Sequence, residues 1–361
     1  MLNASQRSIR LAQGSTCPIA AEPTQSVSVV IPIRNEEHSI RQCLDSILAN
    51  DYPRNLLEIL VVDGRSTDVS RQVVSDYSRR FPVVRLLDNP NRIQAAALNI
   101  GFRTSKADII IRADAHTVYA ADYIRKCVEV LEDTGAANVG GLQRATGGGA
   151  LADAIAVAST TPFGVGNAHF RYAEKEMWVD TVYLGAWRRS TLEALGGFNE
   201  EWAINEDYEF NYRLCRAGGK VFLSPHIVSW YHVRDSFPRL VRQYFRYGLW
   251  KVRTLFLHPT SIRWRQLVPP VFLLSLILSL AAALRFSLLG LVVPISYLAT
   301  NVVTSAVLSL RRGKRLMPLL PLVFATIHIS WAVGFFVGLG RWGAQLLYRW
   351  VHPPTCKGGV N

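Results

Sequence analysis

The sequence has few cysteines and no pattern that would join them. Its 361 residues contain five, which are scattered, odd in number and without a Cys-x-x-Cys pair: Cys17, Cys43, Cys127, Cys215 and Cys356. A disulfide framework or a structural zinc site normally needs paired, regularly spaced cysteines. The cysteine pattern therefore argues against both and fits a main domain that stays in the reducing cytoplasm.

Long runs of Lys and Arg are missing from the N-terminal half, although the formal net charge is +13. The basic residues gather at 239–265 and 311–315, beside an apolar stretch. This placement favours an anionic membrane surface, so we expect membrane lipids as partners and no nucleic acid. The first 25 residues are polar and show no signal peptide, so the globular part is expected to stay where it is made.

Charges are scarce between residues 267 and 347, where three apolar segments follow one another: Leu267–Leu284, Phe286–Leu310 and Leu316–Leu339. About 20 apolar residues span a bilayer core, and three successive segments disfavour buried helices of a soluble domain. Both basic clusters are expected on the cytoplasmic side, which agrees with two crossings between them. A third crossing would place Arg341 and Arg349 outside, so a re-entrant or interfacial path for the third segment stays open.

In the first part of the chain, short apolar runs alternate with segments in which apolar residues recur at helical spacing. Buried strands are predicted at 26–33, 57–62, 83–87 and 108–112, and helices at 37–49, 70–81 and 93–104. This order predicts an α/β fold with parallel, right-handed crossovers. Beyond residue 119 the pattern is more mixed, with strands predicted at 138–142, 179–187 and 221–231 and a glycine-rich loop at 147–149.

Polar residues stand where the predicted strands end. They are Arg34-Asn35-Glu36, Asp63 and Asp114-Ala115-His116, while Asn205-Glu206-Asp207 begins an amphipathic helix. Ligands of open α/β sheets bind beyond the carboxyl ends of the strands. Each aspartate taken singly is more often part of a turn or of a helix N-terminus, where acidic residues are favoured anyway. Their order along the chain is more specific than any one of them.

Taken in order, these motifs resemble a family 2 glycosyltransferase between about Ser26 and Tyr247. The resemblance rests on Val29–Glu37, Val61–Asp68, Ala97–Gly101, Asp114–His116, Gly196–Glu200 and Glu206-Asp207. Within the family, Asp114–His116 and Asp180–Arg189 look like the succinoglycan-type exopolysaccharide glucosyltransferases. The resemblance implies an inverting, metal-dependent hexosyltransferase with a GT-A fold, a Rossmann-like and mostly parallel sheet, followed here by C-terminal transmembrane helices.

The resemblance also implies a role for each matching residue in the donor site. Pro32, Arg34 and Glu36 would line the nucleotide pocket, and Asp63 would accept a hydrogen bond from the uracil edge. Asp114 matches the first carboxylate of the family's Asp-x-Asp, but His116 replaces the second, which puts metal binding in question. An imidazole suits Mn²⁺ better than Mg²⁺, so we expect Mn²⁺ to work at least as well as Mg²⁺. A plain surface histidine is the alternative for His116.

Other matches concern catalysis and the membrane side. Asp207 corresponds to the catalytic base, with Glu206 beside it. Gln243 and Arg246 match a Gln-x-x-Arg-Trp element in which Tyr247 replaces Trp, and Arg246 could pair with the diphosphate. The same segment also reads as an interfacial amphipathic helix. His232 is a candidate metal ligand or an ordinary histidine, and Gly185 would let the backbone approach the donor sugar.

The predicted function is transfer of a hexose, with glucose expected, from a UDP-sugar to a lipid-linked oligosaccharide in bacterial exopolysaccharide or cell-envelope synthesis. The alternatives are a polyprenyl-phosphate sugar synthase, a processive polysaccharide synthase, or a non-catalytic scaffold or nucleotide sensor. We expect a multi-pass protein of the cell inner membrane with its catalytic domain in the cytoplasm. The expected division is a tail at 1–25, the transferase domain at 26–250, an interfacial linker at 251–266, about three transmembrane helices at 267–347 and a tail at 348–361.

Overall fold

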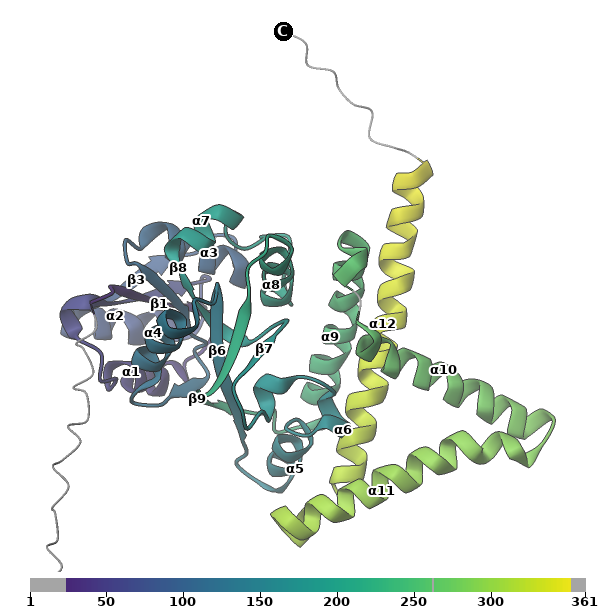
Figure 1. Ribbon diagram of the computed structural model, residues 1–361. Coiled ribbons are helices and arrows are strands. Elements are labelled where there is room, and N and C mark those ends of the chain that lie inside the picture. Colours follow the sequence, from purple (N-terminus) through teal and green to yellow (C-terminus); the bar gives the residue numbers. More distant parts are fainter. Residues whose placement is uncertain (1–23, 262, 352–361) are drawn as a thin grey trace, which may run out of the picture.

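The computed structural model describes residues 24–261 and 263–351 (Figure 1). Almost all of the predicted N-terminal tail and most of the C-terminal tail therefore lie outside the described residues. The described chain forms a globular α/β part, and four long helices, α9 to α12, follow it along one side.

The first half of the sheet is parallel and agrees with the sequence prediction. Its strands lie in the order β3-β2-β1-β4. Their bounds are β1 Val27–Ile33, β2 Leu57–Asp63, β3 Val84–Asp88 and β4 Ile109–Arg112, and the crossover helices are α1 Ile40–Leu48, α2 Ser70–Arg80 and α3 Gln94–Thr104. The strand ends are within one residue of the predicted ones. Runs rich in Val, Ile and Leu mark β1, β2 and β4 as strands that are buried on both faces.

The second half of the sheet is mixed, with the order β4-β8-β6-β9-β5 and with β7 paired to β9. These strands are β5 Thr117–Tyr119, β6 Asn138–Thr146, β7 Met177–Val179, β8 Tyr183–Arg188 and β9 Val221–His232. The prediction of one strand over 179–187 was wrong. The chain changes partners there, because β7 runs antiparallel to β9 whereas β8 runs antiparallel to β4 and β6.

Helices cover both faces of the sheet. One apolar core lies under α1, α2 and α4 (Tyr123–Thr134), and a second lies under α3, α7 (Arg189–Leu195) and α8 (Glu206–Arg216). Gly101 shows how closely α3 approaches the sheet, because a Cβ at this position would overlap the side chain of Val30 in β1. The short 3₁₀ turns are η1 Arg54–Leu56, η2 His169–Arg171, η3 Pro259–Ser261, η4 Leu288–Leu291 and η5 Lys314–Leu316.

The C-terminal helices are α9 Phe237–Leu257, α10 Trp264–Arg285, α11 Val292–Arg312 and α12 Leu320–Val351. Within the described residues, three segments are long and apolar enough to cross a membrane: 266–285, 288–312 and 320–344. They correspond to the three apolar segments predicted from the sequence. The expected domain boundary at residue 250 falls inside α9, and the division into domains stays a prediction.

Helix α9 is packed between the globular part and α12. Two short helices of the globular part, α5 (Ala150–Ala158) and α6 (Pro162–Val165), also reach α12, where the ring of Phe163 meets Phe324 edge to face at 4.9 Å. The backbones of α9 and α12 approach closely at Gly248, where a Cβ would overlap the carbonyl oxygen of Trp331. Small residues at such points allow helices to touch through their backbones.

We expect Gly248→Ala to lower stability by about 1–3 kcal/mol, because overpacking a close contact forces the two helices apart. Gly340→Ala is the matched control, since nothing lies within 4 Å of a Cβ built at Gly340. Thermal unfolding of the detergent-solubilised protein measures both changes. Equal melting temperatures for the two variants would contradict the α9–α12 contact.

Candidate active site

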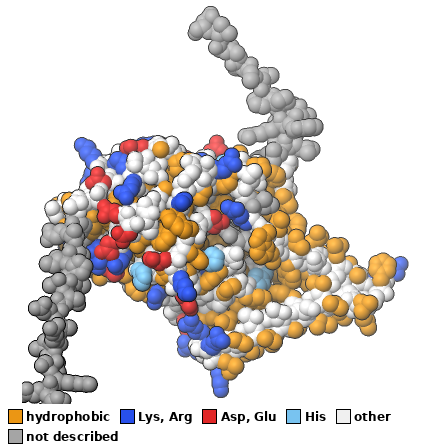
Figure 2. Space-filling model, viewed as in Figure 1, with side chains coloured by type: hydrophobic (Ala, Val, Ile, Leu, Met, Phe, Trp, Pro, Cys, Tyr) orange, Lys and Arg blue, Asp and Glu red, His pale blue; other side chains and the backbone are white. Residues whose placement is uncertain are grey.

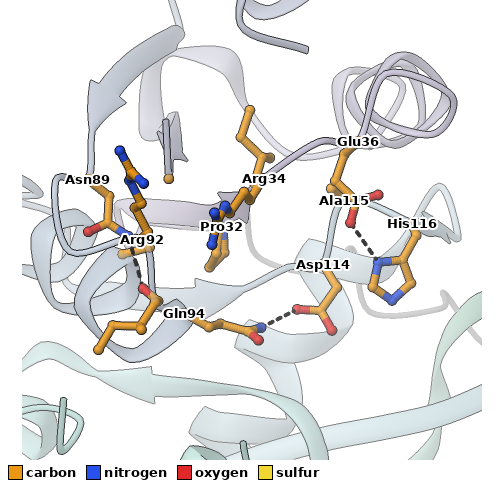
Figure 3. Close-up of a pocket in the computed structure, with 13 residues that line it drawn as sticks. Pro32, Arg34, Glu36, Asn89, Arg92, Gln94, Asp114, Ala115 and His116 are labelled. Atoms are coloured by element: carbon orange, nitrogen blue, oxygen red, sulfur yellow. Dashed lines mark hydrogen bonds and ion pairs between the residues drawn. The ribbon is translucent and has the colours of Figure 1, made fainter. Parts of the chain in front are cut away.

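A pocket of about 190 Å³ lies at the carboxyl ends of the parallel strands (Figure 3). Five predicted site residues line it: Pro32, Arg34, Glu36, Asp114 and His116. The loop between β3 and α3 adds Asn89 and Arg92, and the first residue of α3 adds Gln94; the sequence prediction missed all three. Sequence-distant loops thus meet in one place because the strands that carry them are neighbours in the sheet.

Three of the loops that surround the pocket hold a non-glycine residue in the left-handed region. They are Asn35 after β1, Arg65 after β2 and Arg92 after β3, with φ values of 57°, 58° and 59°. Such conformations are strained for side chains other than glycine and tend to gather at functional sites. Asn35 is stabilised by its own side chain, whose Oδ1 accepts a hydrogen bond from the Thr67 amide at 2.8 Å.

Two guanidinium groups at the pocket have no carboxylate to neutralise them. Arg34 and Arg92 line the pocket, and neither has an ion-pair partner within the described part of the chain. Arginine in this state suits the planar, multidentate recognition of phosphate oxygens. The loop after β3 therefore adds a cation that motif matching did not single out.

Asp63 ends β2 directly before Gly64, which lines the pocket, and its carboxylate is fully buried. Its Oδ1 accepts hydrogen bonds from the Ser66 hydroxyl at 2.6 Å and the Ser66 amide at 3.1 Å, and its Oδ2 accepts one from Arg71 Nη1 at 2.9 Å. The structure thus holds this carboxylate rigidly behind the pocket wall. Contact with a nucleotide base stays a prediction for Asp63.

A buried arginine, Arg112 at the end of β4, joins two of the predicted acidic motifs. Its Nε donates to Asp114 Oδ1 at 3.3 Å. Its Nη1 lies 3.0 Å from Glu206 Oε1, a charge contact whose angle falls outside hydrogen-bond geometry. Burial lowers the pKa of Arg112, but the surrounding carboxylates of Asp114, Glu206 and Asp207 outweigh it, so the pKa is raised and the guanidinium stays charged.

Asp114 is positioned by three side chains. Besides Arg112, Gln94 Nε2 donates to its Oδ1 at 3.2 Å and the Tyr183 hydroxyl donates to its Oδ2 at 3.3 Å. Burial first, and the charge of Asp114 second, raise the pKa of Tyr183 well above its ordinary value. Tyr183 is therefore a neutral hydrogen-bond donor that fixes the orientation of the carboxylate.

Glu206 and Asp207 open helix α8 and differ in exposure. Glu206 is 4% exposed, whereas Asp207 is half-buried. Burial raises the pKa of Glu206 to about 7; the charge of Arg112 opposes this, and those of Asp207 and Asp114 add to it. The pair is thus divided into an inner carboxyl group that contacts Arg112 and an outer one that can meet a substrate.

His116 is paired with Glu36 across the pocket, with Nδ1 3.5 Å from Oε1 (Figure 3). Burial lowers the pKa of His116, but the hydrogen bond that its ring donates to Glu36 and the charges of Asp114 and Glu36 raise the pKa above its ordinary value overall. Burial likewise raises the pKa of Glu36, and His116 and Ser39 more than reverse this, so the net shift is downward. A metal would have to displace the imidazole proton.

The three residues predicted toward the membrane side, Gln243, Arg246 and His232, do not line this pocket. Gln243 donates to the Tyr231 hydroxyl at 3.4 Å, and the Tyr231 ring packs edge-on against His116 at 5.3 Å. Arg246 is exposed on α9. His232 is exposed at the end of β9, with Nδ1 3.2 Å from the Thr146 hydroxyl.

The described residues contain no group of three His, Cys, Asp or Glu side chains that could hold a metal ion. Asp114 and His116 nevertheless fit a cation that binds together with phosphates, because Mg²⁺ and similar ions commonly use one or two protein ligands plus substrate oxygens. Asp114 and His116 therefore suit a cation that binds together with the nucleotide. The role of His232 as a further ligand stays a prediction.

Gly185 lies in the buried part of β8 and has a packing reason to be glycine. Its φ is +126°, and a Cβ there would overlap the ring of Trp187. Closeness to a donor sugar stays a prediction.

Asn99, from the Ala97–Gly101 motif, forms hydrogen bonds to the loop that precedes α8. Its Nδ2 donates to the Phe198 carbonyl at 2.8 Å and to Glu200 Oε1 at 2.9 Å, and its Oδ1 accepts from the Phe198 amide at 2.8 Å. Glu200 Oε2 in turn accepts from Asn91 Nδ2 at 3.1 Å. The motif residue thus ties the loop before α8 to the loop that carries Arg92.

The fold is shared with a solved glycosyltransferase. Mannosyltransferase PcManGT from Pyrobaculum calidifontis, in complex with GDP-Man and Mn²⁺, matches with a TM-score of 0.58 and 21% identity over 86% of this chain and 87% of its own. The mixed sheet with its parallel first half is therefore a GT-A domain, followed by apolar helices, as the resemblance implied.

Sequence comparison gives the family. A model of glycosyl transferase family 2 matches residues 28–188, and one of glycosyl transferase family group 2 matches residues 109–337. Since the second match covers more than half of the chain, the protein belongs to glycosyltransferase family 2, and it is an enzyme of the glycosyltransferase class.

Two curated relatives match over most of their length. The succinoglycan biosynthesis protein ExoA of Rhizobium meliloti is 29% identical over 85% of this chain and 93% of its own. A Methanococcus voltae protein is 29% identical over 87% of this chain and 97% of its own, and is named dolichyl N-acetyl-alpha-D-glucosaminyl phosphate 3-beta-D-2,3-diacetamido-2,3-dideoxy-beta-D-glucuronosyltransferase.

We expect Arg112→Met to destabilise the protein by about 3–5 kcal/mol, because it leaves two buried carboxyl groups without their cation. The loss should shrink as the pH falls below about 7, since the raised pKa of Glu206 lets that carboxyl become neutral. Arg79→Met, which removes an exposed pair with Asp76, should cost about 1 kcal/mol or less. Denaturant unfolding of both variants at two pH values makes the comparison, and a loss at Arg112 no larger than at Arg79 contradicts it.

Proposed function

We propose that this enzyme transfers a hexose, with UDP-glucose the first donor to test, onto a lipid-linked acceptor with inversion at the anomeric carbon. The observation that carries the proposal is the link through Arg112, which holds Asp114 at the donor pocket and the Glu206-Asp207 pair in one assembly. An inverting transfer needs both a place for the leaving diphosphate and a base for the acceptor, and this assembly joins the two.

The pocket supplies the positive charge that the leaving group requires. Arg34 and Arg92 would contact the diphosphate, on which negative charge grows as the bond from the sugar to phosphate breaks. Asp114 and His116 would hold a divalent cation, Mn²⁺ or Mg²⁺, which when bound supplies further neutralisation of the phosphate oxygens. The mannosyltransferase of the same fold is in complex with GDP-Man and Mn²⁺, which supports a nucleotide sugar and a cation here.

Asp207 is the proposed general base. Its carboxylate takes the proton from the acceptor hydroxyl while that oxygen forms its bond to the anomeric carbon on the face opposite the departing nucleotide diphosphate. Glu206 is the positioning residue, since it contacts Arg112 and is almost completely buried. The exposure of Asp207 supports this division of roles.

The lipid-linked acceptor is supported by the relatives and by the apolar helices. The Methanococcus relative is named for a dolichyl phosphate substrate, and the Rhizobium relative is named for succinoglycan biosynthesis. We therefore place the enzyme in exopolysaccharide or cell-envelope glycan synthesis at the cell inner membrane, with the catalytic domain in the cytoplasm.

We expect Asp207→Asn to lower sugar transfer at least 100-fold, as loss of a general base typically does, while nucleotide binding is retained. Asp76→Asn, at an exposed aspartate on α2, is the matched control. Release of UDP from UDP-glucose, within a panel of nucleotide sugars and with Mn²⁺ and a lipid extract as acceptor, measures transfer. Equal turnover in Asp207→Asn and the control would remove Asp207 from the role of base.

His116→Asp should shift the metal preference from Mn²⁺ toward Mg²⁺, because a second carboxylate replaces the imidazole and hard Mg²⁺ prefers oxygen. His116→Ala should lower metal-dependent activity about tenfold or more. His226→Asp, at an exposed histidine of β9, is the control. Titrations of activity with the two metals give the answer, and unchanged titrations in both His116 variants exclude this residue from the cation site.

A further inference from the structure

Helix α9 cannot lie inside the hydrocarbon core of a membrane. It carries five cations along its length, Arg239, Arg242, Arg246, Lys251 and Arg253. Charged groups at the membrane centre are costly. The last turns of α9 are also covered by the globular part, where the Trp202 ring nitrogen donates to the Thr254 hydroxyl at 3.4 Å and Arg253 pairs with Glu201 at 3.0 Å.

Helix α12 is longer than α9 and runs parallel to it, and Figure 1 shows the two side by side. Near the start of both helices, Leu240 and Tyr244 of α9 share an apolar cluster with Leu320 and Phe324 of α12.

Farther along the two helices the contact continues. A Cβ at Gly338 would lie 2.9 Å from the Leu249 carbonyl oxygen, and one at Gly334 would overlap the Phe245 carbonyl. The rings of Trp250 and Trp342 are 5.7 Å apart. Two parallel helices in such close and continuous contact must share one orientation relative to a bilayer, so α12 cannot cross it while α9 stays outside the hydrocarbon core.

The three apolar segments differ in how much of their surface the protein covers. Inside the structure, 44% of the candidate span in α12 is buried, against 6% in α10 and 11% in α11. The exposed large apolar side chains of α12 are Leu322, Ile329, Val333, Phe336, Val337 and Leu339. These side chains lie mainly on one stripe of α12, because its other face packs against α9 and the short helices of the globular part. Helices α10 and α11 expose apolar side chains along most of their length (Figure 2).

The chain returns to the globular part before α12 begins. Helices α10 and α11 project away from it as a hairpin with its turn at residues 286–291 (Figure 1). Directly after α11, Arg315 pairs with Asp153 of α5 at 2.7 Å. The basic cluster at 311–315 is thus on the same side of the membrane as the globular part, so α10 and α11 together make an even number of crossings.

We propose that α9 and α12 form a single layer that lies in the plane of the membrane surface, and that among the described helices only α10 and α11 cross. The partner of this layer is a lipid leaflet. The apolar stripe of α12 enters the acyl region, and the exposed Arg242 and Arg246 of α9, together with the basic residues at 311–315, meet anionic headgroups. Arg341 then stays on the side of the catalytic domain.

This layer would set the distance between the candidate active site and the bilayer. Gln243 of α9 bonds to Tyr231, whose ring touches His116, so the pocket adjoins the layer directly. The proposal itself does not depend on the chemistry of the site, and its test uses no measurement of activity.

Single cysteines in the full-length protein, probed with a membrane-impermeant maleimide in sealed vesicles, test the topology. The background replaces Cys17, Cys215 and Cys356 by Ser and keeps Cys43 and Cys127, which are buried. Asp76→Cys reports the catalytic domain, Ser287→Cys the turn of the hairpin and Arg341→Cys the far end of α12. Arg341→Cys should label from the same side as Asp76→Cys, and Ser287→Cys from the opposite side. Labelling of Arg341→Cys from the side of Ser287 would overturn the proposal.

Depth measurements decide the question even if Arg341→Cys labels poorly from both sides. Nitroxide labels at Leu322, Ile329 and Phe336, one at a time, should report equal depth if α12 lies in the plane. A crossing helix would separate successive labels by about 10 Å, because seven residues of helix rise by that amount. A graded depth along the stripe therefore refutes the in-plane layer, and a uniform shallow depth supports it.

Discussion

The site depends on one buried cation. Without Arg112, the carboxyl groups of Asp114 and Glu206 would repel each other in a region from which water is largely excluded. With it, the end of β4 and the first turn of α8 are fixed to each other, although a long stretch of chain separates them. The outer carboxylate of Asp207 and the donor pocket then keep a constant relation. The inverting transfer proposed above would need that constancy, because attack and departure would occur on opposite faces of one carbon.

Much of this arrangement follows from local sequence patterns. The aliphatic-rich runs of β1, β2 and β4 mark buried parallel strands, and the residues directly after them must meet at one edge of the sheet. Arg34, Glu36, Asp114 and His116 were found this way and do line one pocket. Pro32, which lies within β1 and also lines the pocket, came from the resemblance alone. Their chemical roles, unlike their positions, came from resemblance to a family and are still predictions.

The rest depends on contacts that no periodicity encodes. Arg112 reads as one more residue of an apolar strand, and Arg92 as one more residue of a loop; only the assembled structure gives each its neighbours. The break between β7 and β8 was missed because the two strands pair with different partners, a property of the sheet and not of residues 179–187. The packing of α12 against α9 was not predicted for a similar reason. Hydropathy gives the length of an apolar segment but does not show which helix covers one of its faces.

The hydrogen bonds of Asn99 connect the two halves of the site. Through Glu200 they fasten the loop that bears Arg92 to the loop that leads into Glu206-Asp207. A shift of the first loop when a phosphate group binds would therefore be transmitted to the second without any change in the sheet between them. Binding of a donor in the pocket and positioning of Glu206-Asp207 for the acceptor would then be coupled.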